Sequence, residues 1–234
     1  MNRQGENRPV KQQITSYIRT HKHVLMFLYF PIYLTWFFVL EKLIVSNYWV
    51  SYIPLDDKIP FIPAFILPYV LWFPNIILPA FVLYFKNTGA FKRYGWYVII
   101  SFSLSMLICM VFPNGQNLRP VLPEQKDFFT AWVSMIYAAD TNTNVLPSMH
   151  VVGCMGAAFA AWDIGREKPV WRRWRIPALA LEALISISTV FVKQHSVLDI
   201  IAGVLVGVLV GWPIYRKGSP LRRTQPPKET AAAR

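Results

Sequence analysis

Long apolar runs separated by short polar segments dominate the chain from residue 24 onward. Each run is close to the ~20 residues that an α-helix needs to cross a bilayer, for which the usual range is about 17–25. The pattern therefore predicts an all-α polytopic membrane protein with a bundle of six transmembrane helices. The expected spans are Val24–Val45, Ile62–Phe85, Trp96–Phe112, Val145–Trp162, Ile176–Val192 and Val197–Tyr215.

Polar sequence flanks this apolar region at both ends. Residues 1–22 form a basic tail, residues 23–217 hold the membrane domain, and residues 218–234 have the proline and charge content of a disordered tail. Four prolines between positions 63 and 79 predict a kinked or broken second span. The apolar segment 129–139 is too short to span, and its tryptophan and tyrosine favour a helix at the membrane interface.

Composition and charge support the membrane prediction and add an orientation. Hydrophobic residues make up 54% of the chain, against roughly 45–50% in soluble domains. The net charge is +12, but most lysines and arginines lie in segments that six spans would place on one side. This positive-inside pattern predicts a multi-pass protein of the cell (inner) membrane with both termini in the cytoplasm. It also explains the net positive charge of the chain, so that no nucleic-acid partner is needed to account for it and we expect none.

A few polar residues interrupt the apolar pattern at the boundaries predicted to be extracytoplasmic. His195 and Asp199 stand four residues apart, which on an α-helix places both on one face. Pro147-Ser148-Met149-His150 opens the fourth span, and Arg119 lies in the loop before it. Ionisable groups at membrane depth indicate a functional site by default. Two histidines, a carboxylate, an arginine and a helix N-terminus suit phosphoryl transfer without a metal.

Three motifs in this set resemble the signatures of the type 2 phosphatidic acid phosphatase (PAP2) superfamily. They are LRP at 118–120, PSMH at 147–150 and STVFVKQHSVLD at 188–199. The stretch YAADTNTNVLPSMHV is similar in particular to the branch of inositol phosphorylceramide synthases and inositolphosphotransferase-like proteins. The resemblance covers about residues 112–207, and it implies a six-helix membrane bundle that acts on a lipid phosphate or phosphodiester.

The resemblance also implies a role for individual residues. His195 would attack phosphorus to form a phosphohistidine, Asp199 would support it, and His150 would protonate the leaving oxygen. Arg119 and Ser148 match phosphate-binding positions, and the site would lie on the extracytoplasmic face. The chain departs from the family pattern at Phe112, Met149 and Thr189, where the family has Lys, Gly and Arg. Lys193 is close enough in sequence to replace one of the two missing cations.

Other interpretations of the same residues remain. His195 and Asp199 would also serve as a polar pair between helices, in which case the protein is a non-catalytic lipid-binding or lipid-transport member of the family. A solute transporter is less favoured, because Glu41 and Glu182 are the main carboxylates inside the spans. No sequence pattern predicts a metal or a cofactor. The sequence leaves open the lipid, the choice between water and an alcohol as acceptor, and the oligomeric state.

Overall fold

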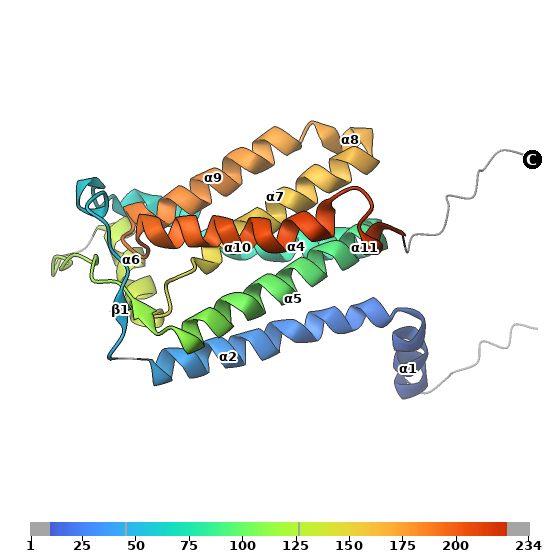
Figure 1. The fold of residues 1–234 in the computed structure, drawn as a ribbon, viewed down its shortest axis with the longest axis horizontal. Helices are drawn as coiled ribbons and strands as arrows, with labels where there is room; N and C mark the ends of the chain where they lie inside the picture. The colour runs from blue at the N-terminus through green and yellow to red at the C-terminus, as the bar shows by residue number, and fades with distance from the viewer. Residues whose placement is uncertain (1–9, 45, 126, 224–234) are drawn as a thin grey trace, which may run out of the picture.

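The computed structural model describes residues 10–44, 46–125 and 127–223, and this part of the chain is mostly helical. Its long helices run roughly along one axis (Figure 1). The elements in chain order are α1 (Val10–Thr20), the 3₁₀ helix η1 (Lys22–Leu28), α2 (Tyr29–Leu43), β1 (Trp49–Val50), η2 (Asp56–Lys58), η3 (Pro63–Phe65), α3 (Ile66–Val70), α4 (Trp72–Lys86), α5 (Thr88–Val111), β2 (Asn114–Gly115), α6 (Phe128–Ala139), α7 (Met149–Glu167), α8 (Pro169–Arg172), α9 (Arg175–Phe191), α10 (Val197–Tyr215) and α11 (Pro220–Arg223).

Within the described residues, five helical stretches are long and apolar enough to cross a membrane, which indicates a multi-pass membrane protein. They are Lys22–Leu43, Pro63–Lys86, Thr88–Val111, Pro169–Phe191 and Val197–Tyr215. The predicted count of six spans is therefore not confirmed. The fourth expected run begins its helix later than predicted, at Met149, and forms α7, which is not among the five.

Helix α7 lies in the middle of the bundle, which explains its lower apolar content. It packs against α4, α5, α9 and α10, and much of its surface is buried by protein. Two glycines permit the close approach: a Cβ at Gly153 would lie 2.7 Å from Trp72 Nε1, and one at Gly156 would lie 2.5 Å from the Tyr97 ring. A helix surrounded by other helices needs no lipid-compatible face, so hydropathy alone underestimates it.

The proline-rich second run is broken, as its sequence predicts. Helix α3 ends at Val70, a turn follows at Leu71, and α4 starts at Trp72 with Pro79 in its interior. The break turns the chain so that Tyr69 and Trp72 both point toward the start of α7, where each ring contacts the His150 ring.

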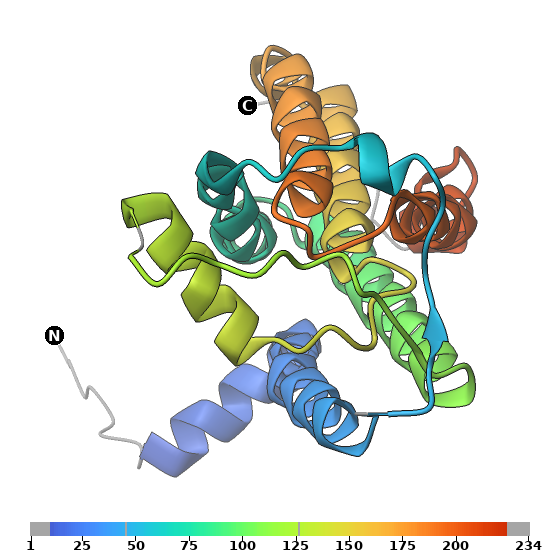
Figure 2. The ribbon, with the colours of Figure 1, turned by 90° about the vertical axis from the view of Figure 1, so that its left-hand side faces the viewer.

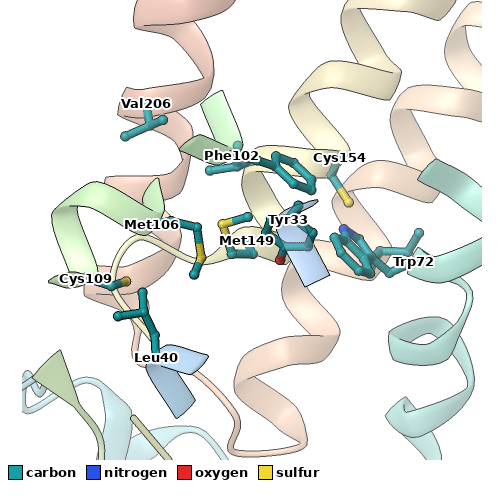
Figure 3. Close-up of a cluster of buried hydrophobic side chains, with 11 residues drawn as sticks. Tyr33, Leu40, Trp72, Phe102, Met106, Cys109, Met149, Cys154 and Val206 are labelled. Carbon is teal, nitrogen blue, oxygen red and sulfur yellow. The ribbon is translucent and has the colours of Figure 1, made fainter. Parts of the chain in front are cut away.

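A buried apolar cluster fixes the first turn of α7. Met149 lies among Tyr33 of α2, Phe102 and Met106 of α5, and Trp72 of α4 (Figure 3). Because Met149 directly precedes His150, the packing of its side chain also sets the position of the histidine backbone. The hydrophobic core therefore begins at Met149, directly beside the predicted site residue His150.

One end of the bundle carries most of the irregular chain. There β1 and β2 pair in parallel, with Trp49 opposite Asn114 and Val50 opposite Gly115, and α6 lies across the same end (Figures 1 and 2). The opposite end carries α1, α8 and α11 (Figure 1). This pairing draws the loop after α2 toward the loop after α5, and it places Ser51 under the start of α10.

Both terminal segments contain helix in their described parts. Helix α1 lies within the segment set apart as a basic tail, and α11 lies within the segment expected to be disordered. Arg222 of α11 is bonded to Asp163 of α7, which ties residues 220–223 to the bundle. Residues 1–9 and 224–234 of the two predicted tails lie outside the described residues.

Candidate functional site

His195 and Asp199 form the predicted pair, but by a different local geometry. His195 precedes α10, Ser196 is its N-cap, and Asp199 is the third helical residue of a capping box. Asp199 Oδ2 accepts from the Ser196 backbone N–H at 2.9 Å and lies 3.2 Å from His195 Nδ1. The expectation that both residues share one helix face was wrong, because Ser196 begins the helix between them. The bond assigns the His195 proton to Nδ1 and leaves a lone pair on Nε2.

The other oxygen of Asp199 has a partner that sequence reasoning missed. Ser51 Oγ donates to Asp199 Oδ1 at 2.5 Å, and both side chains are fully buried. With one oxygen held by Ser51 and the other by Ser196, the carboxylate has little rotational freedom. The orientation of the His195 ring is therefore set by a chain of three side chains that begins at Ser51, 148 residues before Asp199 in the sequence.

A second carboxylate, also unforeseen, holds the same corner together. Asp56 accepts from Ser196 Oγ at 2.7 Å, from the Val197 N–H at 2.9 Å and from the Ile53 N–H at 2.9 Å. It therefore satisfies a free N–H at the start of α10 and fixes the loop that carries Ser51. No local motif marks Ser51 or Asp56, since their roles exist only once the loop meets α10.

His150 faces His195 across the start of the bundle. Its ring lies between Tyr69 and Trp72, at centroid distances of 4.3 and 4.6 Å, and 5.8 Å from the ring of His195. Trp72 Nε1 donates to the His150 carbonyl at 3.0 Å. His150 is 8% exposed, and its Nε2 is buried without a hydrogen-bond partner. A buried imidazole nitrogen left open in this way is available to a ligand.

Ser148 acts as the N-cap of α7. Its Oγ accepts from the Val151 N–H at 3.5 Å, and its own N–H donates to the Asp199 carbonyl at 3.0 Å. The second bond joins the first turns of α7 and α10, which carry His150 and Asp199. Ser148 thus holds the two halves of the site in register, and its hydroxyl is directed at its own helix.

Arg119 is nearby but is occupied by the chain itself. Its Nη2 donates to the carbonyls of Asp140 and Thr141 at 2.9 and 2.5 Å and to Gln194 Oε1 at 2.5 Å. Its guanidinium lies 4.5 Å from the centre of the Tyr137 ring, and burial lowers its pKa. Arg119 therefore ties the end of α6 to the residue before His195.

Lys193 is likewise directed away from the two imidazoles. It adopts a positive φ of 55°, and its Nζ donates to the Asp56 carbonyl at 2.8 Å. Gln116 Nε2 donates to the Lys193 carbonyl at 3.1 Å. The structure thus brings His150, His195 and Asp199 together. The three residues expected to bind phosphate lie around them with Arg119 Nη1 and Nη2, Lys193 Nζ and Ser148 Oγ bonded to the chain, whereas Arg119 Nε is buried without a partner.

Next to the two histidines, a cavity of about 630 Å³ runs along the bundle between α2, α4, α5 and α7. Its polar end is formed by His150, His195, Gln194, Asp140 and Asn144, and its body by aromatic and aliphatic side chains of the spans. No lysine or arginine is found among the described residues that line it. The shape and lining suit a molecule with a polar head and an apolar body.

Two carboxylates flank the polar end. Glu41 of α2 accepts from Asn144 Nδ2 at 2.7 Å and from the Thr141 N–H at 3.0 Å, which supplies the partners that its apolar span lacks. Burial, and then the nearby Glu41, raise the pKa of Asp140 to about 6, against the opposing effect of His195 and Arg119. Asn144 Oδ1 is buried without a partner. Asp140 and Asn144 both line the cavity.

Comparison with family models matches residues 93–223 to the PAP2 superfamily, which is more than half of the chain and includes every predicted site residue. The chain belongs to the PAP2 superfamily. No curated protein and no solved structure matches it. PAP2 membership indicates a membrane phosphatase or phosphotransferase. The matched region of this PAP2 protein leaves out α2 and α4, which line the apolar part of the cavity.

Across residues 10–44, 46–125 and 127–223 of this PAP2 protein, no three His, Cys, Asp or Glu side chains are grouped to hold a metal ion. The described lining of the cavity includes the two imidazoles, the carboxylate of Asp140 and the side-chain amides of Gln194 and Asn144, together with the hydroxyls of Thr141, Thr143 and several tyrosines.

Proposed function

We propose that this protein is an integral membrane lipid phosphatase or phosphotransferase that works through a phosphohistidine on His195. The observation that carries the proposal is the facing pair of imidazoles at the polar end of an otherwise apolar cavity. One imidazole is oriented by Asp199, and the other leaves Nε2 open and buried. A catalytic nucleophile and a general acid require this division of roles.

The reaction consists of two transfers at phosphorus. In the first, the lone pair of His195 Nε2 attacks and the bond between phosphorus and the leaving oxygen breaks. His150 enters this step as the imidazolium, gives its Nε2 proton to that oxygen and becomes neutral. In the second, His150 takes a proton from water or an alcohol, whose oxygen attacks phosphorus as the bond to His195 breaks. Asp199 stabilises the positive charge that His195 carries in both transition states.

The cavity supports a lipid as the substrate. Its polar end lies at the histidines, and its body continues between α2 and α4 past side chains such as Tyr33, Phe37 and Phe81. An acyl chain placed there would hold the phosphate of its headgroup beside His150 and His195. Burial of the chain against this lining supplies binding energy remote from the reacting phosphorus.

The lack of a cation in the described lining favours a substrate of low charge. Arg119 and Lys193 both donate to carbonyl oxygens of the chain, and Asp140 adds negative charge when ionised. A phosphodiester carries less charge than a phosphomonoester and needs less neutralisation. This supports transfer from a phosphodiester lipid to an alcohol, in keeping with the inositolphosphotransferase-like branch that the sequence resembles.

The orientation of the protein in the membrane is also part of the proposal. Helices α1, α8 and α11 lie at the end of the bundle opposite β1 and α6 (Figure 1), and basic segments flank them in the sequence. The positive-inside rule then favours cytoplasmic termini and an extracytoplasmic site in the cell (inner) membrane.

The alternative of a non-catalytic lipid carrier differs in one measurable property, which is turnover. Purified protein is incubated with a panel of lipid phosphates and phosphodiesters, and released phosphate and transferred headgroup are both measured. We expect turnover in the wild type and in His21→Ala, a matched histidine change away from the site, and none in His195→Ala. Binding of the lipids without turnover in any variant would favour the carrier.

A further inference from the structure

A second cavity, of about 480 Å³, lies on the other side of α4 from the first. Residues of α4, α7, α8 and α9 line it, and none of them lines the histidine cavity. Helices α4 and α9 both pack on α7, where Ala157, Ala160 and Ala161 present only methyl groups to the space between them. The result is an apolar groove whose floor is α7 and whose walls are α4 and α9.

The groove is long enough to hold an acyl chain of one membrane leaflet. Its lining on α4 runs from Leu71 to Lys86, which is about 22 Å at the helical rise of 1.5 Å per residue. Half of the hydrocarbon thickness of a bilayer is about 15 Å. One polar pair lies in the groove, where Asn75 Nδ2 donates to Glu182 Oε2 at 2.7 Å, and it is satisfied within the protein. An acyl chain therefore suits the groove better than a polar solute does.

Positive charge and aromatic rings gather at one mouth of the groove. Lys86, Trp171 and Trp174 line it there, and Lys168 Nζ lies 3.5 Å from the Lys86 carbonyl, to which it donates. The nearby carboxylate of Glu167 is already engaged by Arg93 and Asn87. Tryptophans beside lysines are typical of the level at which lipid headgroups lie, and the lysines attract anionic headgroups.

We propose that this groove is a binding site for a resident anionic phospholipid, separate from the substrate cavity. One acyl chain lies on the alanine face of α7, and the headgroup phosphate lies against Lys86 and Lys168. The lipid belongs to the leaflet opposite the two histidines, because the charged mouth adjoins α8, at the end of the bundle away from β1 and α6 (Figure 1). The bound chain fills the space between α4 and α9 and thereby links both helices to α7.

Quenching of tryptophan fluorescence by brominated acyl chains tests this site. Purified protein is reconstituted in phosphatidylcholine vesicles that contain increasing fractions of brominated phosphatidylglycerol or, in a parallel series, brominated phosphatidylcholine. The signal of Trp171 and Trp174 is obtained as the difference between the wild type and a Trp171→Phe/Trp174→Phe variant. We expect half-maximal quenching at a several-fold lower fraction of the anionic lipid than of the zwitterionic lipid.

Two sets of variants distinguish quenching by a lipid bound in the groove from quenching by the surrounding bilayer. Lys86→Ala/Lys168→Ala, which changes only exposed side chains, should remove the preference for the anionic lipid, whereas the matched control Lys92→Ala/Lys217→Ala should keep it. Ala161→Phe, which places a ring in the groove, should weaken quenching by both lipids. Identical curves for the two lipids in the wild type, or an unchanged preference in Lys86→Ala/Lys168→Ala, would overturn the proposal.

Discussion

The two ends of helix α7 solve the same problem, the burial of polar side chains, in opposite ways. At its C-terminal end, Arg93 of α5 donates to Asp163 at 2.7 Å and to Glu167 at 2.5 Å, and Arg222 of α11 bonds the other oxygen of Asp163. Each carboxylate there is paired with a guanidinium. That end is an ionic cluster that holds three segments of the chain together.

At the N-terminal end of α7, the buried groups are held by neutral partners and some are left open. Asp199 is bonded by a hydroxyl, a backbone N–H and an imidazole, and Glu41 is bonded by threonine and asparagine. His150 Nε2 and Asn144 Oδ1 have no partner. Arg93 Nη1 and Arg222 Nε at the C-terminal end also lack a partner, but neither residue lines one of the two cavities. We infer that the C-terminal end serves stability and that the N-terminal end serves chemistry, because unpaired polar atoms beside a cavity cost stability and gain a function only when a ligand binds.

The largest effect is expected from Asp199→Asn at the histidine end. The amide donates where the carboxylate accepted, so His195 would carry its proton on Nε2 and lose the lone pair that attacks phosphorus. We expect turnover to fall by about 10³–10⁴-fold, with little loss of folded protein. The matched change Asp57→Asn, at an exposed carboxylate bonded to Tyr52, should leave turnover near the wild-type value. Equal turnover in both variants would contradict the role of Asp199.

At the C-terminal end of α7, the equivalent substitution should lower the stability of the protein and leave its activity unchanged. Asp163→Asn leaves Arg93 buried with one carboxylate partner fewer, so we expect a loss of about 3–5 kcal/mol in the free energy of unfolding. Turnover per folded molecule should be unchanged. Thermal unfolding in detergent and active-site titration of the surviving protein measure the two effects separately. A variant as stable as the wild type but inactive would reverse the assignment of the two ends.

A smaller effect is expected from Ser51→Ala. The substitution removes one hydrogen bond to Asp199 Oδ1 and leaves the bonds to Ser196 and His195 in place. We expect turnover to fall about tenfold, since a hydrogen bond to a charged group contributes about 1.5–3 kcal/mol. Ser51→Thr, which keeps the hydroxyl, should restore most of it. Equal turnover in Ser51→Ala and the wild type would show that this hydroxyl does not act on Asp199.

The smallest effect concerns pH and Asp140. Its pKa is about 6 in the folded protein and about 3.9 when the chain is unfolded, so the folded state binds the proton more tightly. The stability of the wild type is therefore greatest below pH 4 with respect to this group, and part of it is lost as pH rises through 6. Asp140→Asn, which stays neutral, should raise the melting temperature more at pH 8 than at pH 5. An advantage that shrinks toward pH 8 would refute this assignment.

The sequence alone predicted the helical membrane class and the contact between His195 and Asp199, whereas the catalytic roles of the site residues remain predictions. Apolar runs of membrane length predicted a helical membrane bundle, and the spacing of His195 and Asp199 predicted their contact, because both signals are local. The position of His150 followed from the expected topology. The family was correctly recognised from the same residues, and its finer branch remains a prediction.

The remaining features depend on contacts between distant segments. Ser51 and Asp56 reach α10 only because β1 pairs with β2, which no local pattern specifies. Arg119 has the right charge for phosphate, yet the carbonyls that occupy it belong to the loop after α6. The count of six spans is not confirmed, since α7, which packs against α4, α5, α9 and α10, is not among the five candidate spans of the described residues.

The most direct test of the proposed chemistry is the site of covalent phosphorylation. Protein mixed with a labelled lipid substrate is quenched in alkali, which preserves phosphohistidine, and the modified peptide is identified by mass spectrometry. We predict a phosphoryl group on His195, absent in His195→Ala and longer-lived in His150→Ala when the label enters through a substrate whose leaving group needs no proton. Turnover of the lipid with no phosphoryl group on His195, or with one on another residue, would contradict the mechanism.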